Sequence, residues 1–438
     1  MNPTKKNIVS VALTVVFLLT SSSCNSQNIK KEFVEIKPSD EPVTITMSWW
    51  GDDSCNKATL KAIDLFEETH ENITVEADYG EWNGWKQKLT DDINNNTAAD
   101  IMQINYDWLN DMSADGEVFY DLELLNQNLN LSGLSHNILK YGKIKKTINA
   151  VPFSMTGLSL FYNETAFRKL NVAVPETWDE LFDAADVFRT KNCYPLNIDN
   201  GSGYSAWYIS VIYLQQKTGK QFITDSGKPG FSVDDISDAL EFYKSLIDSG
   251  VVPSVQYQKN SSLPFYENEA FTSGKIAGIC DWNDTVYKYE NSLESGKLVA
   301  GKLPVRENAP MTGWFTKPST MLAVKKDSRY LYEVSLLLDF LLNNPDCARI
   351  LGTTRGIPAC EYALDAIKNT DKLNGNMYDA AHELLDVDPC VINPLMENPQ
   401  MQSYYNDALE AVSYGILTPH QAAEGLYANM VYTLKRIR

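Results

Sequence analysis

The feature that most constrains the fold is a regular alternation of strand-like and helix-like segments after residue 42. Val43–Trp50 is an apolar, β-branched run typical of a buried strand, and a helical pattern follows over 57–69. A second strand is predicted over Ile73–Tyr79, a second helix over 85–94 and a third strand over 100–104. Strands that alternate with helices in this way form a largely parallel sheet covered by helices. The sequence therefore predicts an α/β fold.

Helix-start and helix-stop signals are clear in the second half of the chain. Thr177 and Glu180 have the spacing of a capping box, so a helix is expected to begin there. Ser232 is a second cap, and Gly250 is placed to end the helix that follows it. The pattern from Tyr330 onward predicts a mostly helical C-terminal third.

Length and charge limit the domain count and the partners. The chain has 438 residues, more than one hydrophobic core normally supports, so we expect two lobes. Its net charge of −19 is opposite to the basic surface that a nucleic-acid-binding protein needs. The same charge disfavours binding of the folded part to anionic membrane surfaces. We therefore expect no nucleic acid among its partners.

The first 42 residues predict export and anchoring. A lysine pair precedes the apolar run Ile8–Leu19, which is too short to span a bilayer but suits an export signal. Small residues then run into Cys24, and this resembles a bacterial lipoprotein signal that is cut before a lipid-modified cysteine. We therefore predict a signal peptide over 1–23, lipid on Cys24 and a flexible tether over 24–42. An ordinary secretory signal with an incidental cysteine is the alternative.

The remaining cysteines do not form a recognisable metal or redox motif. None of them belongs to a Cys-x-x-Cys pair, which disfavours a zinc ribbon or a thioredoxin-type site. An even number in an exported protein permits disulfides, but isolated buried thiols fit the wide spacing equally well. The six residues are Cys55, Cys193, Cys280, Cys347, Cys360 and Cys390.

No catalytic constellation stands out in the sequence. It lacks the His-Glu-x-x-His, Gly-x-Ser-x-Gly and P-loop motifs, and its four histidines are not spaced as metal ligands. The 57 acidic residues permit a pair of glycosidase carboxylates but select no particular pair. The residues themselves therefore select no catalytic site and no metal site.

Many aromatic residues stand in polar, turn-like contexts outside apolar stripes. A sugar offers an apolar C–H face and a belt of hydroxyls, so its site combines flat rings with polar groups. Such rings indicate a carbohydrate site, although each would serve core packing equally well. The rings with polar neighbours are Trp82, Trp85, Tyr106, Trp108, Tyr204, Trp207, Trp282, Trp314, Tyr404 and Tyr405.

Six segments match, in order along the chain, the motifs of one protein family. Gly356-Ile-Pro358 matches its Gly-(Leu/Ile/Val)-Pro turn, and Val174–Leu181 is close to its Pro-x-Thr-Trp-x-Glu-Leu motif. The other segments are Ala99–Met102, Gly116–Leu122, Val151–Asn163 and Phe265–Trp282. Through them the chain resembles the extracellular solute-binding proteins of ABC importers, in particular the family of the maltose-binding protein.

This resemblance implies a two-lobed α/β fold of the periplasmic-binding-protein type (type II), with a hinge between the lobes. Strands are then expected to cross between the lobes near Val151–Met155, Trp314–Met321 and Ala359–Ala363. The implied lobes are 43–152 with 316–361 for lobe 1, and 153–315 with 362–438 for lobe 2. The ligand would bind in the cleft between them.

The resemblance also implies which residues form the cleft. The matching aromatic positions on lobe 2 are Tyr204, Trp282 and Tyr405. The matching polar positions on lobe 1 are Asp52, Asp53 and Asp107. Asp53 replaces a lysine of the family and Ile104 replaces a tryptophan, which argues against maltodextrin as the ligand. We add five residues to the predicted cleft because their own neighbours place them at strand ends or crossings: Trp50, Tyr106, Trp108, Trp314 and Arg355.

The implied function is capture of a carbohydrate, an oligosaccharide in particular, for delivery to ABC permease subunits. Contacts with the second lobe would favour the closed form that the permease recognises. The lipid would hold the protein, as a monomer, outside the cytoplasmic membrane, at the cell surface or in the periplasm. Such a protein is not an enzyme and needs no cofactor and no metal. Two alternatives stay open: a secreted polysaccharide hydrolase or lyase, and the same fold with a polyamine or peptide as its ligand.

Overall fold

The structure, a computed structural model, describes residues 36–199, 205–224, 226–255, 257, 264–368, 370 and 375–436. The predicted signal peptide, Cys24 and most of the predicted tether lie outside the described residues. Over the described ranges, no helix is both long enough and apolar enough to cross a membrane. We use lobe 1 for the elements packed around the first three strands, and lobe 2 for those around strand β7.

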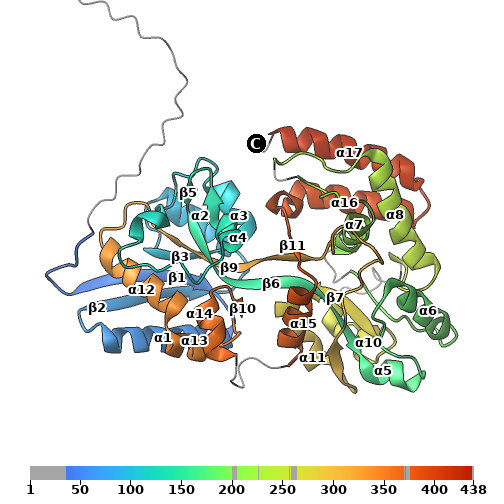
Figure 1. The fold of residues 1–438 in the computed structure, drawn as a ribbon, viewed down its shortest axis with the longest axis horizontal. Coiled ribbons are helices and arrows are strands. Elements are labelled where there is room, and N and C mark those ends of the chain that lie inside the picture. The colour runs from blue at the N-terminus through green and yellow to red at the C-terminus, as the bar shows by residue number, and fades with distance from the viewer. Residues whose placement is uncertain are drawn as a thin grey trace, which may run out of the picture. The chain divides into compact units, whose positions relative to one another are not determined.

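The sheet of lobe 1 confirms the strand–helix alternation that the sequence predicts. β1 (Val43–Trp50) pairs in parallel with both β2 (Ile73–Gly80) and β3 (Ile101–Ile104). α1 (Asp53–Thr69) connects β1 to β2, and α2 (Trp85–Asn94) connects β2 to β3 (Figure 1). The fold is therefore α/β, and the carboxyl ends of the three strands meet at one edge of the sheet.

α1 begins earlier than the helical pattern over 57–69 indicates. The carboxylate of Asp52 accepts a hydrogen bond of 2.8 Å from the Cys55 N–H, so Asp52 is the N-cap residue. A capping carboxylate satisfies a backbone donor that the first turn leaves open, and it interacts favourably with the helix dipole. Residues 53–56, of which only Cys55 is buried, are therefore helical although they add little to the apolar stripe.

Two long strands, β6 and β9, pass through both lobes (Figure 1). β6 (Ala150–Asn163) pairs antiparallel with β9 (Phe315–Val324), and β9 also pairs with β3. Further along, β6 pairs with β7 (Gly278–Trp282) and β8 (Leu298–Ala300). Every residue of β6 except Met155 is buried, as expected of a strand covered on both faces. These two strands contain the first two predicted crossings.

The third predicted crossing, near Ala359–Ala363, is not a strand, and that prediction was wrong. The strand there is the short β10 (Ile357–Pro358), and the chain then enters α14 (Glu361–Ile367). Ile367 packs in the same hydrophobic cluster as Phe66 of α1, so α14 belongs with lobe 1. The apolar residues after Pro358 serve a helix face in place of a strand. The lobe boundaries stay predictions, and we propose to move this one beyond Ile367.

The remaining elements divide between the lobes as follows (Figure 1). Lobe 1 also has α3 (Tyr106–Met112), α4 (His136–Leu139), β4 (Lys143–Ile144), β5 (Thr147–Ile148), α12 (Leu331–Asn343) and α13 (Pro345–Leu351). Lobe 2 has α5 (Glu164–Lys169), α6 (Trp178–Arg189), α7 (Ser205–Thr218), α8 (Val233–Asp248), α10 (Glu269–Thr272), α11 (Val286–Ser292), α15 (Gly375–Asp386), β11 (Cys390–Val391), α16 (Pro399–Ser413) and α17 (Pro419–Arg436). The 3-10 helices are η1 (Leu122–Leu125), η2 (Lys140–Gly142), η3 (Phe265–Glu267), η4 (Asn283–Thr285) and η5 (Pro394–Glu397). The described chain after Tyr330 is therefore mostly helical, as predicted.

The predicted helix caps are found with one change. The Thr177 hydroxyl accepts from the Glu180 N–H at 3.2 Å, but the Glu180 carboxylate accepts from Glu176, one residue before the cap. Ser232 forms a complete capping box with Asp235 at the start of α8. α8 ends at Asp248, and Gly250 follows at φ +78°, a left-handed conformation that favours glycine.

The six described cysteines are all free thiols. Burial is the largest cause of a raised pKa at each of them, and it raises the pKa of Cys347 to about 12. Of the two possibilities that the sequence leaves open, the structure therefore has isolated thiols and not disulfides.

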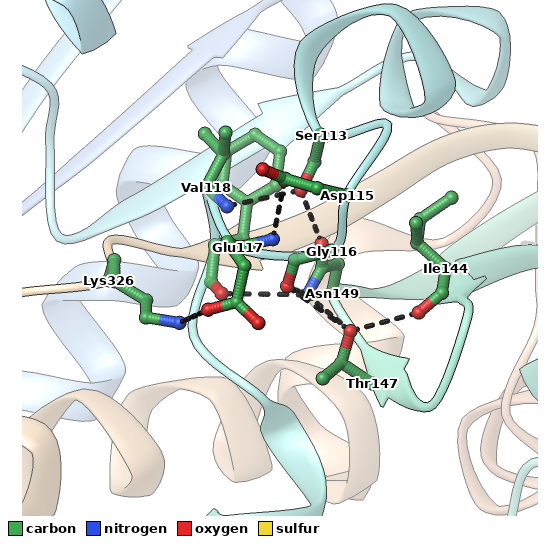
Figure 2. Close-up of polar contacts among 10 residues, drawn as sticks. Ser113, Asp115, Gly116, Glu117, Val118, Ile144, Thr147, Asn149 and Lys326 are labelled. Atoms are coloured by element: carbon green, nitrogen blue, oxygen red, sulfur yellow. Dashed lines mark hydrogen bonds and ion pairs between the residues drawn. The ribbon is translucent and has the colours of Figure 1, made fainter.

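A buried asparagine holds the segment that contains Gly116 (Figure 2). Asn149 is fully buried; its amide oxygen accepts from the Ser113 hydroxyl at 2.6 Å, and its amide nitrogen donates to the Gly116 carbonyl at 3.1 Å. The Thr147 hydroxyl donates to the same carbonyl at 3.2 Å. Gly116 has φ +80°, and a Cβ there would lie 2.7 Å from the Thr147 hydroxyl, so only glycine fits. This network joins the loop after α3 to β5 and the start of β6.

Replacing Asn149 with alanine should therefore destabilise the protein. The substitution leaves the Ser113 hydroxyl and the Gly116 carbonyl buried with fewer partners, which costs about 2 kcal/mol or more of unfolding free energy. Urea denaturation of Asn149→Ala would measure this loss. The exposed Asn72 supplies the matched control, since Asn72→Ala should change the unfolding free energy by less than about 0.5 kcal/mol. Equal effects of the two substitutions would contradict the assigned role of Asn149.

Candidate functional site

Three tryptophans meet at the carboxyl ends of β1, β2 and β3. Trp50 ends β1, Trp82 lies in the turn before α2, and Trp108 lies in the first turn of α3. The ring centroid of Trp50 is 5.2 Å from that of Trp82 and 5.0 Å from that of Trp108, and Trp82 is 5.0 Å from Trp108. Trp82 is 50% exposed, so the cluster presents an aromatic face to solvent. In open α/β sheets this edge is where ligands bind.

Trp282 supplies an aromatic ring from lobe 2, at the end of β7. The Lys317 ammonium lies 4.3 Å from the centroid of the Trp282 ring, a cation–π arrangement. Lys317 comes from β9 and also forms an ion pair with Glu397 in η5, and both side chains are mostly buried. Lys317 therefore contacts both Trp282 of lobe 2 and Glu397, whose 3-10 helix η5 packs next to α3.

Asp107 of α3 interacts electrostatically with both members of this ion pair. Burial raises the pKa of Asp107 to about 6; the negative charge of Glu397 adds to the rise, and Lys317 and Lys86 oppose it. Oxygen Oδ1 of Asp107 and oxygen Oε2 of Glu397 are buried without a hydrogen-bond partner among the described residues. Both side chains line a cavity of ≈ 20 Å³ between α3 and the η5–α16 segment. Two buried hydrogen-bond acceptors without a partner among the described residues therefore belong to side chains that line this cavity.

The other predicted acidic positions have structural explanations as well. Asp52 caps α1, and Asp53 lies exposed in the first turn of the same helix. Asp52 is also near lobe 2: after burial it is the main cause of the raised pKa of Tyr287 in α11. Asp52 therefore faces the opposite lobe, whereas Asp53 shows no contact with the tryptophan cluster among the described interactions.

Arg355 is buried within lobe 1 next to the hinge strands. Its guanidinium donates to the Thr59 hydroxyl at 2.7 Å and to the Gln103 side-chain carbonyl. Burial is the main cause of its lowered pKa, and the side chain is 8% exposed. Its backbone carbonyl accepts from the Ser154 hydroxyl. These contacts fix α1, β3 and β6 relative to one another.

Three predicted aromatic residues lie in the core. Trp314 is fully buried and its indole N–H donates to the Pro304 carbonyl at 3.0 Å. Tyr405 is fully buried and stacks on Trp207 with centroids 5.5 Å apart. Tyr106 is buried and donates to the Ile392 carbonyl at 3.3 Å. Tyr204 lies outside the described residues. Of the predicted positions, the structure thus groups Trp50 with Trp108 and places Asp107 and Trp282 each near Lys317, whereas Trp314, Tyr405 and Tyr106 are buried.

Two residues of this site, Lys317 and Glu397, are absent from the sequence prediction. They are 80 residues apart and meet only through the fold, so no local pattern joins them. A lysine in the middle of an apolar crossing strand was the one signal available, because an unpaired lysine is seldom buried.

A larger cavity, of ≈ 840 Å³, lies beside the other face of α3. Its lining includes Tyr106, Tyr141, Phe222 and Phe315 but none of the clustered tryptophans. The tryptophan cluster remains the stronger candidate because it exposes an aromatic ring, Trp82, at the carboxyl edge of the sheet. The described residues contain no group of three or more metal-ligating side chains.

The raised pKa of Asp107 makes the stability of the protein depend on pH. Because the pKa rises from 3.8 to about 6, the folded protein binds more protons than the unfolded chain in this window. Its stability therefore falls as the pH rises through the window. Asp107→Asn stays uncharged, so it should be more stable than the parent by about 1–3 kcal/mol above pH 7 and nearly equal to it at pH 4.

Thermal unfolding of the two proteins across pH 4–8 would measure this difference. Asp91→Asn removes an exposed carboxylate of α2 and should leave the pH dependence unchanged. The assigned environment of Asp107 would be wrong if Asp107→Asn and the parent lost stability in parallel.

Comparison with known proteins places this architecture in a family. The chain matches the bacterial extracellular solute-binding proteins over residues 61–374. A Brucella abortus relative, named only as a binding protein, is 26% identical over 191 residues, which are 42% of this chain and 45% of the relative. The chain thus matches less than half the length of that protein. The mannitol-binding protein of Pseudomonas aeruginosa is 25% identical over 66% of this chain and 63% of its own length.

A solved structure extends the likeness to nearly the whole chain. The periplasmic oligogalacturonide-binding protein of Yersinia enterocolitica, in complex with saturated digalacturonic acid, superposes with a TM-score of 0.79. It is 30% identical, and the match covers 90% of this chain and 99% of that one. The two-lobed fold and the family match lead to one conclusion: this chain belongs to the bacterial extracellular solute-binding proteins.

Proposed function

We propose that this protein captures a carbohydrate, an oligosaccharide in particular, between its two lobes and delivers it to an ABC permease. The tryptophan cluster Trp50–Trp82–Trp108 is the observation that carries the proposal. Stacked indoles with one exposed face suit the apolar C–H face of a pyranose ring. The sugar-binding names of the relatives support the same class of ligand.

The polar groups beside the cluster suit the hydroxyl belt of a sugar. Buried carboxylate oxygens on Asp107 and Glu397 lack donors, and a ligand hydroxyl would supply them. Trp282 would stack on the ligand from lobe 2 through the ring face that Lys317 does not cover. Trp314 and Tyr405 would support the lobe 2 side of the site from within the core. Asp52 would face the ligand at the N-terminus of α1.

Hinge closure would follow from contacts that only the closed form makes. Ligand held on lobe 1 gains further contacts when lobe 2 approaches, and this difference in affinity shifts the population toward the closed form. β6 and β9 connect the lobes and would carry the bend. The permease would then recognise the closed form, and a monomer suffices for this cycle.

Thermal shift with a panel of ligands would test the proposal. The protein is first unfolded and refolded to remove carried ligand. Neutral and charged oligosaccharides, polyamines and peptides are then added. A ligand at ~100 times its Kd should stabilise the fold by roughly 2.7 kcal/mol. A lasting shift with glycans is expected; shifts with polyamines alone would contradict the sugar assignment, and a shift that decays as products form would mean an enzyme.

Tryptophan variants then locate the site, using the glycan that gives the largest shift. Trp82→Ala and Trp282→Ala should each weaken binding about tenfold or more in calorimetric titration, because each removes a stacking face. Tyr432→Ala is the matched control, since Tyr432 is 59% exposed on α17. Equal losses in all three variants, or none, would place the ligand elsewhere.

We further propose that lipid on Cys24 anchors the protein at the outer face of the cytoplasmic membrane. Extracellular solute-binding proteins act in the periplasm or outside the cell, and an anchor keeps the protein near its permease. Cys24→Ser in the full chain should move the protein from the membrane fraction to the soluble fraction of the producing bacterium. Cys193→Ser controls for loss of a thiol, and retention of Cys24→Ser in the membrane would refute the anchor.

A further inference from the structure

One lysine, next to the Trp282 ring, is shared by three carboxylates. Lys317 forms an ion pair with Glu397. It also lowers the pKa of Asp107 and of Asp284 against the larger effect of burial, so both carboxylates lie within its electrostatic field. The three acids come from η5, α3 and η4, which are far apart in the sequence. When all are ionised, this cluster carries a net charge of −2.

The other cations near the site are already engaged. Arg355 donates to Thr59 and Gln103 inside lobe 1. Lys86 forms an ion pair of 2.8 Å with Asp111 on α3. In the part of the chain that the structure describes, the charge of the site therefore remains negative.

The side-chain atoms without partners at the cavity beside α3 are acceptors. Glu397 is 8% exposed and its Oε2 has no hydrogen-bond partner among the described residues; Oδ1 of Asp107 is in the same situation. Both side chains line the cavity between α3 and η5. A hydroxyl donates to such oxygens, whereas a ligand carboxylate only accepts and adds a like charge at low dielectric.

We propose that the site selects uncharged sugars over sugars that bear a carboxylate, and that Asp107 and Glu397 set this selectivity. The inference rests on the proposed function and names its ligand class. It separates this chain from the Yersinia enterocolitica protein, whose structure holds saturated digalacturonic acid. The two chains share a fold and 30% of their residues, and the charge at the site would decide which sugars each one takes.

Matched pairs of neutral and acidic sugars test this selectivity. α-1,4-linked digalactose and digalacturonic acid differ only at C6, where one has a hydroxymethyl group and the other a carboxylate. The same comparison is made for the neutral glycan that gives the largest thermal shift and its uronate counterpart. Calorimetric titration at pH 7.5, where Asp107 is ionised, should show the neutral member binding about tenfold or more tightly.

Charge-neutralising variants assign the effect to the two residues. Asp107→Asn and Glu397→Gln keep the size of each side chain and should each raise the affinity for the uronate about tenfold relative to the neutral sugar. Asp91→Asn, which removes an exposed charge, should leave the ratio unchanged. Melting curves confirm that each variant is folded, and either of the two variants alone can decide the result.

The outcomes separate this inference from the function on which it rests. Preference for the neutral sugar that shrinks in either folded variant supports it. Equal or tighter binding of the uronate by the parent protein overturns it and leaves the carbohydrate function intact, as does a preference that neither variant changes. Binding of no glycan in the whole panel overturns the proposed function and this inference together.

Discussion

The antiparallel pairing of β6 with β9 is the constraint on which the rest of the structure depends. β6 is hydrogen-bonded to lobe 1 strands near its start and to β7 and β8 near its end. The register shifts around Ser154, and the Ser154 hydroxyl lies 2.6–2.7 Å from the Ser319 hydroxyl, the Thr320 hydroxyl and the Arg355 carbonyl. Because the pairing is irregular at this polar point, a bend between the lobes would be absorbed most easily here.

The site combines two physical environments that the sheet topology brings together. β1 of lobe 1 ends in Trp50, next to Trp82 and Trp108, and β7 of lobe 2 ends in Trp282. Lys317 on the shared strand β9 lies beside Trp282 and pairs with Glu397, one of three nearby carboxylates. Low local dielectric strengthens the interactions of these charges. In the proposed function, the aromatic area would supply affinity for sugar rings, and the buried charges would select among the substituents on those rings.

Local patterns in the sequence predicted the fold well, and they predicted the site only in part. β1, β2 and β3 follow from β-branched runs separated by helical stripes, and the caps at Thr177 and Ser232 follow from hydrogen-bonding side chains. The third crossing, taken from the family resemblance, was wrong because the residues after Pro358 form a helix. Polar neighbours mark Trp282, which is half-buried, yet the same signal at Trp108, Trp314 and Tyr405 accompanies burial. Burial, and the pairing of Lys317 with Glu397, depend on long-range packing that neighbouring residues do not reveal.

The six free thiols bear on how the protein matures. Their raised pKa values keep the reactive thiolate scarce, so exchange with oxidised thiols is slow for the buried ones. Because the described fold contains no cystine, its formation does not require oxidation of these thiols. Burial protects them only once the chain has folded, so in an oxidising compartment wrong pairings can form while the chain is unfolded.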